Sequence, residues 1–270
     1  MNNPVYISTG CFTGRINGRD PHLLSRFYDK LDCDGFELMM DEDLYPQIKN
    51  IIAEYRALEI NIPVFHMNKQ TGDLCSTPGK ENLEAAAELV KRDSEIALSL
   101  GAGRCVFHPW GIPDSDAHPA MLYERMKVLI ETGRKCGVEL MPENCVCVNH
   151  SPLFHLKNAL ESFDFRATVD CRAAAFHGEV EKTVSTLPVE SIGHFHIIDY
   201  HGAPGDWTAR KDIRQPGEGD IDWDAFFDVL KARGCNASVT MEASHMLSDG
   251  VACEVLNRSV EFIRNKLRER

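Results

Sequence analysis

The sequence predicts an α/β fold, a single (β/α)8 TIM barrel that comprises residues 1–270. Short apolar runs rich in β-branched residues alternate with helical patterns along the whole chain. We count eight such pairs, with no internal repeat, low-complexity tract or linker between them, and about 250 residues suffice for one barrel. No glycine-rich phosphate-binding motif follows the first run, which disfavours an open doubly wound sheet.

The eight runs predicted as strands are short and are bounded by glycine, proline or polar residues. In order, they are Val5–Ile7, Gly35–Met39, Ile62–His66, Arg104–His108, Val138–Met141, Arg166–Asp170, Ile192–Ile198 and Ala237–Glu242. A helical pattern follows each run. The predicted helices are Pro21–Leu31, Pro46–Leu58, Glu81–Leu100, Ala120–Cys136, Pro152–Ser162, Gly178–Leu187, Trp223–Arg233 and Val251–Leu267. Gly101, Gly137 and Gly234 directly follow three of these helices, as expected for glycines that end a helix.

Composition excludes several classes of partner. The formal net charge of −12 argues against binding to a nucleic-acid backbone. The apolar runs are far shorter than the roughly 20 residues that span a bilayer, and no basic and apolar leader precedes the first strand. The 10 cysteines have no paired spacing, which is typical of reduced thiols. We therefore expect a cytoplasmic protein without membrane or nucleic-acid partners.

Polar side chains stand where the predicted strands end. They are His66, His108, Glu143, Asp170, His196 and Glu242, with Glu37 near the end of the second strand. In a barrel, the C-terminal strand ends converge on one face, which carries the active site. Side chains distant in the sequence are therefore predicted to surround one cavity. A set drawn from His, Asp and Glu suits a divalent ion such as Mn²⁺, Mg²⁺, Co²⁺ or Zn²⁺.

Each of these residues also has an ordinary structural explanation. Asp170 is placed to cap the helix that follows it, and a histidine at a strand end often only hydrogen-bonds to its neighbours. His194 and His196 are two positions apart in one strand, so their side chains point to the same face. To account for all the candidates in this way, a separate structural explanation is needed for each one, always at the same end of its strand. One shared site explains them together, and we therefore favour it.

Four segments resemble the xylose isomerase-like barrel superfamily. They are Met141–Asn144, Thr168–Asp170, Gly193–His196 and Thr240–Glu242, and Pro216–Trp223 is similar to the loop before the last helix of that superfamily. The superfamily includes sugar epimerases and isomerases, inosose dehydratases and the endonuclease IV group of DNA-repair enzymes. The resemblance extends over nearly the whole chain and does not identify a substrate.

The epimerase and isomerase branch implies one divalent metal ion held by Glu143, Asp170, His196 and Glu242. In that branch the two glutamates, here Glu143 and Glu242, also act as catalytic acid and base. The ion stabilises an enediolate as a proton leaves the carbon beside a carbonyl group. The resemblance therefore predicts an isomerase or epimerase of a small sugar or keto-polyol, and the ligand set does not distinguish isomerisation, epimerisation and dehydration.

Three alternatives remain at this stage: an inosose dehydratase-like lyase, an endonuclease IV-like zinc hydrolase, and a non-catalytic binding subunit. The hydrolase branch uses three zinc ions, and His66 and His108 match its histidines on the third and fourth strands. However, its histidine three residues after the strand-six aspartate is Ala173 here, and its later Asp-x-His pair has no counterpart. These differences disfavour the hydrolase.

Several residues are predicted to contact substrate. They are His66, His108, Trp110, Arg210 and Glu37. Asp199 and His201 are candidates for the groups that orient the His196 ring, and His177 is expected to be an ordinary histidine at a helix start. The expected partner is a small carbohydrate or polyol, and the oligomeric state is left open.

Overall fold

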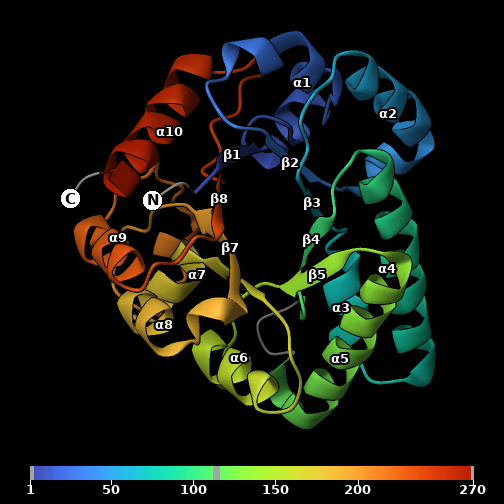
Figure 1. Cartoon of the computed structure of the whole chain (residues 1–270), viewed down its shortest axis with the longest axis vertical. Coiled ribbons are helices and arrows are strands. Elements are labelled where there is room, and N and C mark those ends of the chain that lie inside the picture. Colours follow the sequence, from blue (N-terminus) through green and yellow to red (C-terminus); the bar gives the residue numbers. More distant parts are fainter. Residues whose placement is uncertain (1–2, 112–115, 269–270) are drawn as a thin grey trace.

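Eight parallel strands form one sheet that is nearly closed into a barrel, with helices around the outside (Figure 1). The computed structural model describes residues 3–111 and 116–268. The strands are β1 (Val5–Ser8), β2 (Phe36–Met39), β3 (Val64–His66), β4 (Arg104–Phe107), β5 (Glu139–Pro142), β6 (Ala167–Asp170), β7 (Ile192–Ile197) and β8 (Ser238–Met241). They lie in the order β5-β4-β3-β2-β1-β8-β7-β6. The predicted α/β barrel and its strand order along the chain are confirmed.

The helices lie on the outer surface, between consecutive strands and after β8. They are α1 (His22–Phe27), α2 (Ile48–Ala57), α3 (Gln70–Ser76), α4 (Lys80–Ser99), α5 (Pro119–Cys136), α6 (Pro152–Leu160), α7 (Cys171–Phe176), α8 (Val180–Thr186), α9 (Trp223–Ala232) and α10 (Cys253–Arg268). Gly137, with φ of 91°, caps α5 in the left-handed conformation that glycine adopts without strain. In the described part of the chain, no helix combines the length and apolar character needed to cross a membrane.

Two helices were not predicted. Helix α3 carries the sequence QTGDLCS, which lacks an extended apolar period, and α7 begins directly after β6. The carboxylate of Asp170 caps α7 by accepting a hydrogen bond from the Ala173 amide, so the structural role weighed for Asp170 is real. The helix expected from Pro46 begins only at Ile48, because Glu42–Gln47 forms a 3₁₀ helix.

The barrel closes between β5 and β6, the two ends of the sheet. One isolated bridge joins Glu143 to Thr168, and the Asn144 amide donates to the Thr168 carbonyl at 3.2 Å. The Asn144 side chain adds two bonds across the same junction, since its Nδ2 donates to the Asp170 carbonyl at 3.1 Å and its Oδ1 accepts from the Asp170 amide. A side chain thus completes the hydrogen bonding that the short strands leave unmade.

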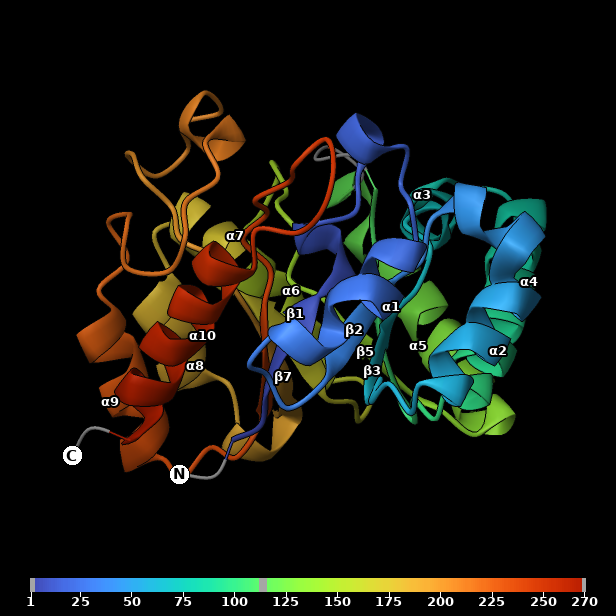
Figure 2. The same cartoon turned by 90° about the horizontal axis from the view of Figure 1, so that it is seen from above.

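The C-terminal ends of the strands face a group of loops that rise from one side of the barrel. Figure 2 shows the orange segment after β7 and the red segment after β8 projecting on this side, together with a blue turn that follows β1. Side chains from these loops line a cavity of about 480 Å³. This volume lies within the range typical of small-molecule sites.

Candidate active site

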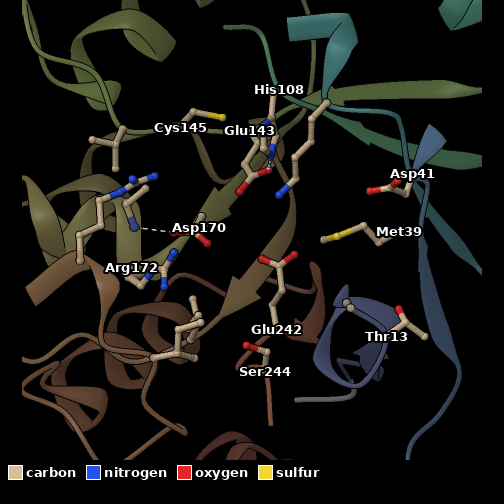
Figure 3. A pocket seen from close by; sticks show the side chains of 18 of the residues that line it. Thr13, Met39, Asp41, His108, Glu143, Cys145, Asp170, Arg172, Glu242 and Ser244 are labelled. Carbon is tan, nitrogen blue, oxygen red and sulfur yellow. Dashed lines mark hydrogen bonds and ion pairs between the residues drawn. The ribbon is translucent and has the colours of Figure 1, made fainter. Parts of the chain in front are cut away.

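Four polar side chains at the C-terminal strand ends converge on one point. Glu143 follows β5, Asp170 ends β6, His196 lies in β7 and Glu242 follows β8. Their potential ligand atoms all lie within 4.8 Å of one another. The carboxylates of Glu143, Asp170 and Glu242 face a common space in Figure 3. The structure therefore brings together all four residues that the resemblance implied as metal ligands.

The hydrogen bonding of His196 directs an electron pair toward this point. Its Nε2 lies 3.0 Å from Glu37 Oε1, and a carboxylate accepts only, so Nε2 carries a proton. Its Nδ1 lies 3.3 Å from Glu143 Oε1 and 3.2 Å from Glu242 Oε2. A neutral ring would therefore point a lone pair at two carboxylates. Only a proton or another cation between these atoms makes the arrangement favourable.

The charges at this point also favour a cation. Burial, together with the charges of Glu143 and Glu242, raises the pKa of Asp170 to about 7. Burial by itself would lower the pKa of His196, but the neighbouring carboxylates more than offset it and hold that pKa well above its usual value. Two buried carboxylates, the partly buried carboxylate of Glu242 and an imidazole nitrogen thus suit a divalent ion such as Mn²⁺, Mg²⁺, Co²⁺ or Zn²⁺.

His66 and His108 lie on the other side of Glu143. Glu143 Oε2 is 3.3 Å from His66 Nε2 and 3.0 Å from His108 Nε2. The His66 Nδ1–H donates to the Met67 carbonyl at 2.9 Å, which directs Nε2 toward the carboxylate. His66, His108 and Glu143 therefore form a second group with the composition of a metal site. Of these two histidines, His108 lines the cavity, whereas His66 is fully buried beneath it.

The predicted substrate contacts divide into two sets. His108 and Arg210 line the cavity. Glu37, His66 and Trp110 are fully buried and are not part of its wall. The structure therefore brings only two of the five side chains to the cavity surface.

Trp110 is held in a packed cluster behind the loop that follows Glu143. Its Nε1–H donates to the Val146 carbonyl at 3.1 Å, and its ring lies 5.1 Å from the His155 ring. His155 in turn hydrogen-bonds to Asp116, which accepts from the backbone amides of residues 149 and 150. This cluster fixes the loop, and it explains why Trp110 packs inside the protein instead of facing a sugar.

Glu37 has a role that its sequence position does not reveal. Its two carboxylate oxygens accept hydrogen bonds from His196, from His194 at 3.0 Å and from Thr240 at 2.7 Å. Glu37 is therefore the group that orients the His196 ring. This corrects the expectation for Asp199 and His201.

Asp199 and His201 both lie away from the His196 ring. Asp199 accepts from the Trp223 indole and from the amides of residues 200 and 217, whereas His201 is exposed and lies 2.9 Å from Asp220. His177 directly follows the last residue of α7, so it stands at a helix end and not at the helix start that the sequence suggested. Its ring lies beside the Cys147 amide, at 3.4 Å, and does not line the cavity.

The family is shown by a match that extends over most of the chain. A family model described as "xylose isomerase-like TIM barrel" matches residues 26–266. The chain belongs to this family.

Solved structures of epimerases and an epimerase-like protein share the fold of this chain over nearly its whole length. A D-tagatose 3-epimerase-like protein is 16% identical, with a TM-score of 0.75, and the match covers 98% of this chain and 97% of that one. The D-psicose 3-epimerase of Clostridium cellulolyticum is 15% identical, with a TM-score of 0.71 and coverages of 98% and 99%. The 3-keto-D-glucoside 4-epimerase of E. coli is 16% identical, with a TM-score of 0.71 and coverages of 98% and 100%.

Proposed function

We propose that this protein is a divalent-metal-dependent epimerase or isomerase of a small keto-sugar or keto-polyol. Glu143, Asp170, His196 and Glu242 would hold the ion, and Glu143 and Glu242 would also be the catalytic acid and base. The epimerases of similar fold support a sugar as the substrate class.

One observation carries the proposal. Glu143 and Glu242 both lie against His196 Nδ1, and both also line the cavity. Both glutamates therefore lie next to the proposed ion and next to the space for a bound molecule. The second oxygen of Glu143 also lies against His66 and His108, at 3.3 and 3.0 Å. The two glutamates project from β5 and β8, so they approach the cavity from different parts of the barrel rim (Figure 3).

This arrangement suits proton transfer at carbon. One glutamate would remove the proton from the carbon beside the substrate carbonyl, and the other would return a proton to the product. Return to the opposite face of the same carbon gives an epimer, and return to the neighbouring carbon gives an aldose–ketose pair. A divalent ion, when bound, supplies Lewis-acid stabilisation of the negative charge on the substrate oxygens.

Solvent exchange tests the proposed reaction directly. The Mn²⁺-supplied protein is incubated in D₂O with a panel of ketoses, and the products are followed by NMR. We expect deuterium at the carbon beside the carbonyl, together with an epimer or an aldose. Loss of water to give a deoxy-dicarbonyl product would instead assign the dehydratase reaction, and no exchange with any ketose would contradict the proposal.

The metal content follows from the same assignment. We expect about one divalent ion per chain after chelation and reconstitution, because His66 and His108 then serve Glu143 as hydrogen-bonding partners. Elemental analysis and equilibrium dialysis measure this number. Two or three ions per chain would make His66, His108 and Glu143 a second site and would favour the hydrolase alternative. A matched His66→Gln variant should retain the single ion.

A further inference from the structure

The cavity is lined by several basic side chains that are not part of the proposed ion site. Five basic side chains line it, namely Arg15, Arg19, Lys69, Arg172 and Arg210. Arg19 is paired with Asp41 at 3.1 Å and with Asp43 at 2.5 Å, so its charge is balanced. This local excess contrasts with the net charge of −12 for the whole chain.

Arg172 and Arg210 have no such partners. Among the residues that the structure describes, neither guanidinium group makes a salt bridge or a side-chain hydrogen bond, and the Nε of Arg210 is buried without an acceptor. Burial, followed by the charge of Arg172, lowers the pKa of Arg210, so the two cations are close enough to repel each other. An unpaired buried donor beside a like charge needs an acceptor from outside the protein, and a bound anion would supply both the acceptor and the balancing charge.

The nearest carboxylate does not balance this pair. Asp170 interacts electrostatically with both arginines. However, it belongs with Glu143 and Glu242 to the proposed ion site, so the ion would offset part of its charge. With a divalent ion bound, the three carboxylates would retain one negative charge. Two arginines alone exceed it, and Lys69 and Arg15 add further positive charge to the same cavity.

A backbone hydrogen bond and aromatic packing join the two segments that carry these arginines. Arg172 lies in α7, and the backbone of that helix is joined to the loop of Arg210 because the Gly205 amide donates to the Phe176 carbonyl at 2.7 Å. The Trp207 ring packs against Phe176 at 4.8 Å, and the guanidinium of Arg210 lies 5.7 Å from the centre of the Trp207 ring. Figure 3 shows Arg172 beside Asp170, across the cavity from Met39 and Asp41.

We propose that Arg172 and Arg210 form an oxyanion subsite, so that the substrate is a keto-sugar with a phosphate or carboxylate group. A guanidinium group binds phosphate and carboxylate in the same way, because two parallel N–H groups donate to two oxygens of either anion. This inference rests on the proposed function for the sugar part of the substrate. It adds a substrate class that differs from the neutral sugars named for D-tagatose and D-psicose epimerases.

Equilibrium binding tests the subsite without any turnover. Calorimetry on the Mn²⁺-supplied protein compares D-fructose 6-phosphate with D-fructose, and 5-keto-D-gluconate with its neutral counterpart L-sorbose. We expect the anionic member of at least one pair to bind about 10- to 100-fold more tightly, and to lose this advantage as the salt concentration rises. The pair with the larger ratio identifies phosphate or carboxylate as the source. Equal affinities within both pairs would overturn the inference.

Variants then assign the effect to the two arginines. Arg172→Met and Arg210→Met keep an apolar stem and remove the charge, and each should reduce the anion-to-neutral affinity ratio about tenfold or more. Arg56→Met, on the exposed surface of α2, is the matched control and should leave the ratio unchanged. Mn²⁺ binding, followed by electron paramagnetic resonance, verifies that each variant retains the ion site.

The possible failures are distinguishable. If both variants lose neutral and anionic ligands in equal proportion, the arginines hold sugar hydroxyls or the ion site, and the inference is wrong. If neutral ketoses are epimerised and the anion-to-neutral ratio is near one, the proposed function stands without the subsite. If the anion binds through Arg172 and Arg210 but no ketose exchanges deuterium, the subsite stands and the proposed reaction fails.

Discussion

Glu143→Gln and Glu242→Gln are each expected to reduce turnover by roughly 10²- to 10⁴-fold, the range typical of a lost general base. Glutamine keeps an oxygen that can face the ion but has no basic lone pair for a proton on carbon. Ion affinity should therefore fall only modestly, whereas Asp170→Asn should act mainly by losing the ion. Steady-state kinetics at saturating Mn²⁺ measures the loss of turnover, and a separate Mn²⁺ titration measures the loss of ion affinity.

Deuterium exchange distinguishes the roles of the two glutamates. The variant that lacks the first base should not exchange the substrate proton at all, whereas the variant that lacks only the returning acid should exchange it on one face without product. Glu139→Gln, at the opposite end of β5 and paired with Arg166, is the matched control and should behave as wild type. Wild-type exchange and turnover in both the Glu143 and Glu242 variants would refute the two-carboxylate mechanism.

Glu37→Gln should weaken ion binding about 10- to 100-fold, although Glu37 itself lies outside the cavity. Its carboxylate accepts from His194 and His196 through different oxygens, and an amide offers only one acceptor oxygen for the two rings. The His196 ring would lose the hydrogen bond that holds its proton on Nε2 and leaves the lone pair of Nδ1 available to the ion. Titration with Mn²⁺, followed by electron paramagnetic resonance, measures the change.

The same variant should lower the stability of the protein. Breaking a buried hydrogen-bonded charge network by removing one partner costs about 3–5 kcal/mol, and urea unfolding of the metal-free protein reports this loss. Thr240→Val removes a neutral donor to Glu37 and its contact with His194 at 2.9 Å, but Glu37 keeps its contacts with His194 and His196, so ion affinity should change much less. Unchanged ion affinity in Glu37→Gln would show that the ring is oriented by other contacts.

The strands could be predicted because each barrel strand is a short apolar run bounded by turn residues. The meeting of the six polar residues at the strand ends could also be predicted, since the C-terminal ends of parallel strands necessarily lie at one face. The choice of four of them as ligands came from the resemblance to the epimerase and isomerase branch. Helix α7 could not be predicted, because it has only six residues and starts directly from the last residue of β6. Without it, Arg172 had no predicted position.

Contacts across the barrel explain the other differences. Glu37 meets His196 only because β2 and β7 place their inward-facing side chains at the same depth, and neither local pattern contains this information. Trp110 follows a strand end, which is the position expected for a residue that contacts substrate. Its burial depends on the Asp116 and His155 cluster, which assembles segments far apart in the sequence.

The junction between β5 and β6 has a consequence for the opening motions of the barrel. It is the place where the sheet ends meet with one bridge and the bonds of Asn144, and Glu143 and Asp170 stand on its two sides. An ion shared by these carboxylates would cross-link the sheet ends. Amides on both sides of the junction would then exchange with solvent more slowly in the loaded protein. Release of the ion would allow this one junction to open transiently while the other strand pairs stay protected.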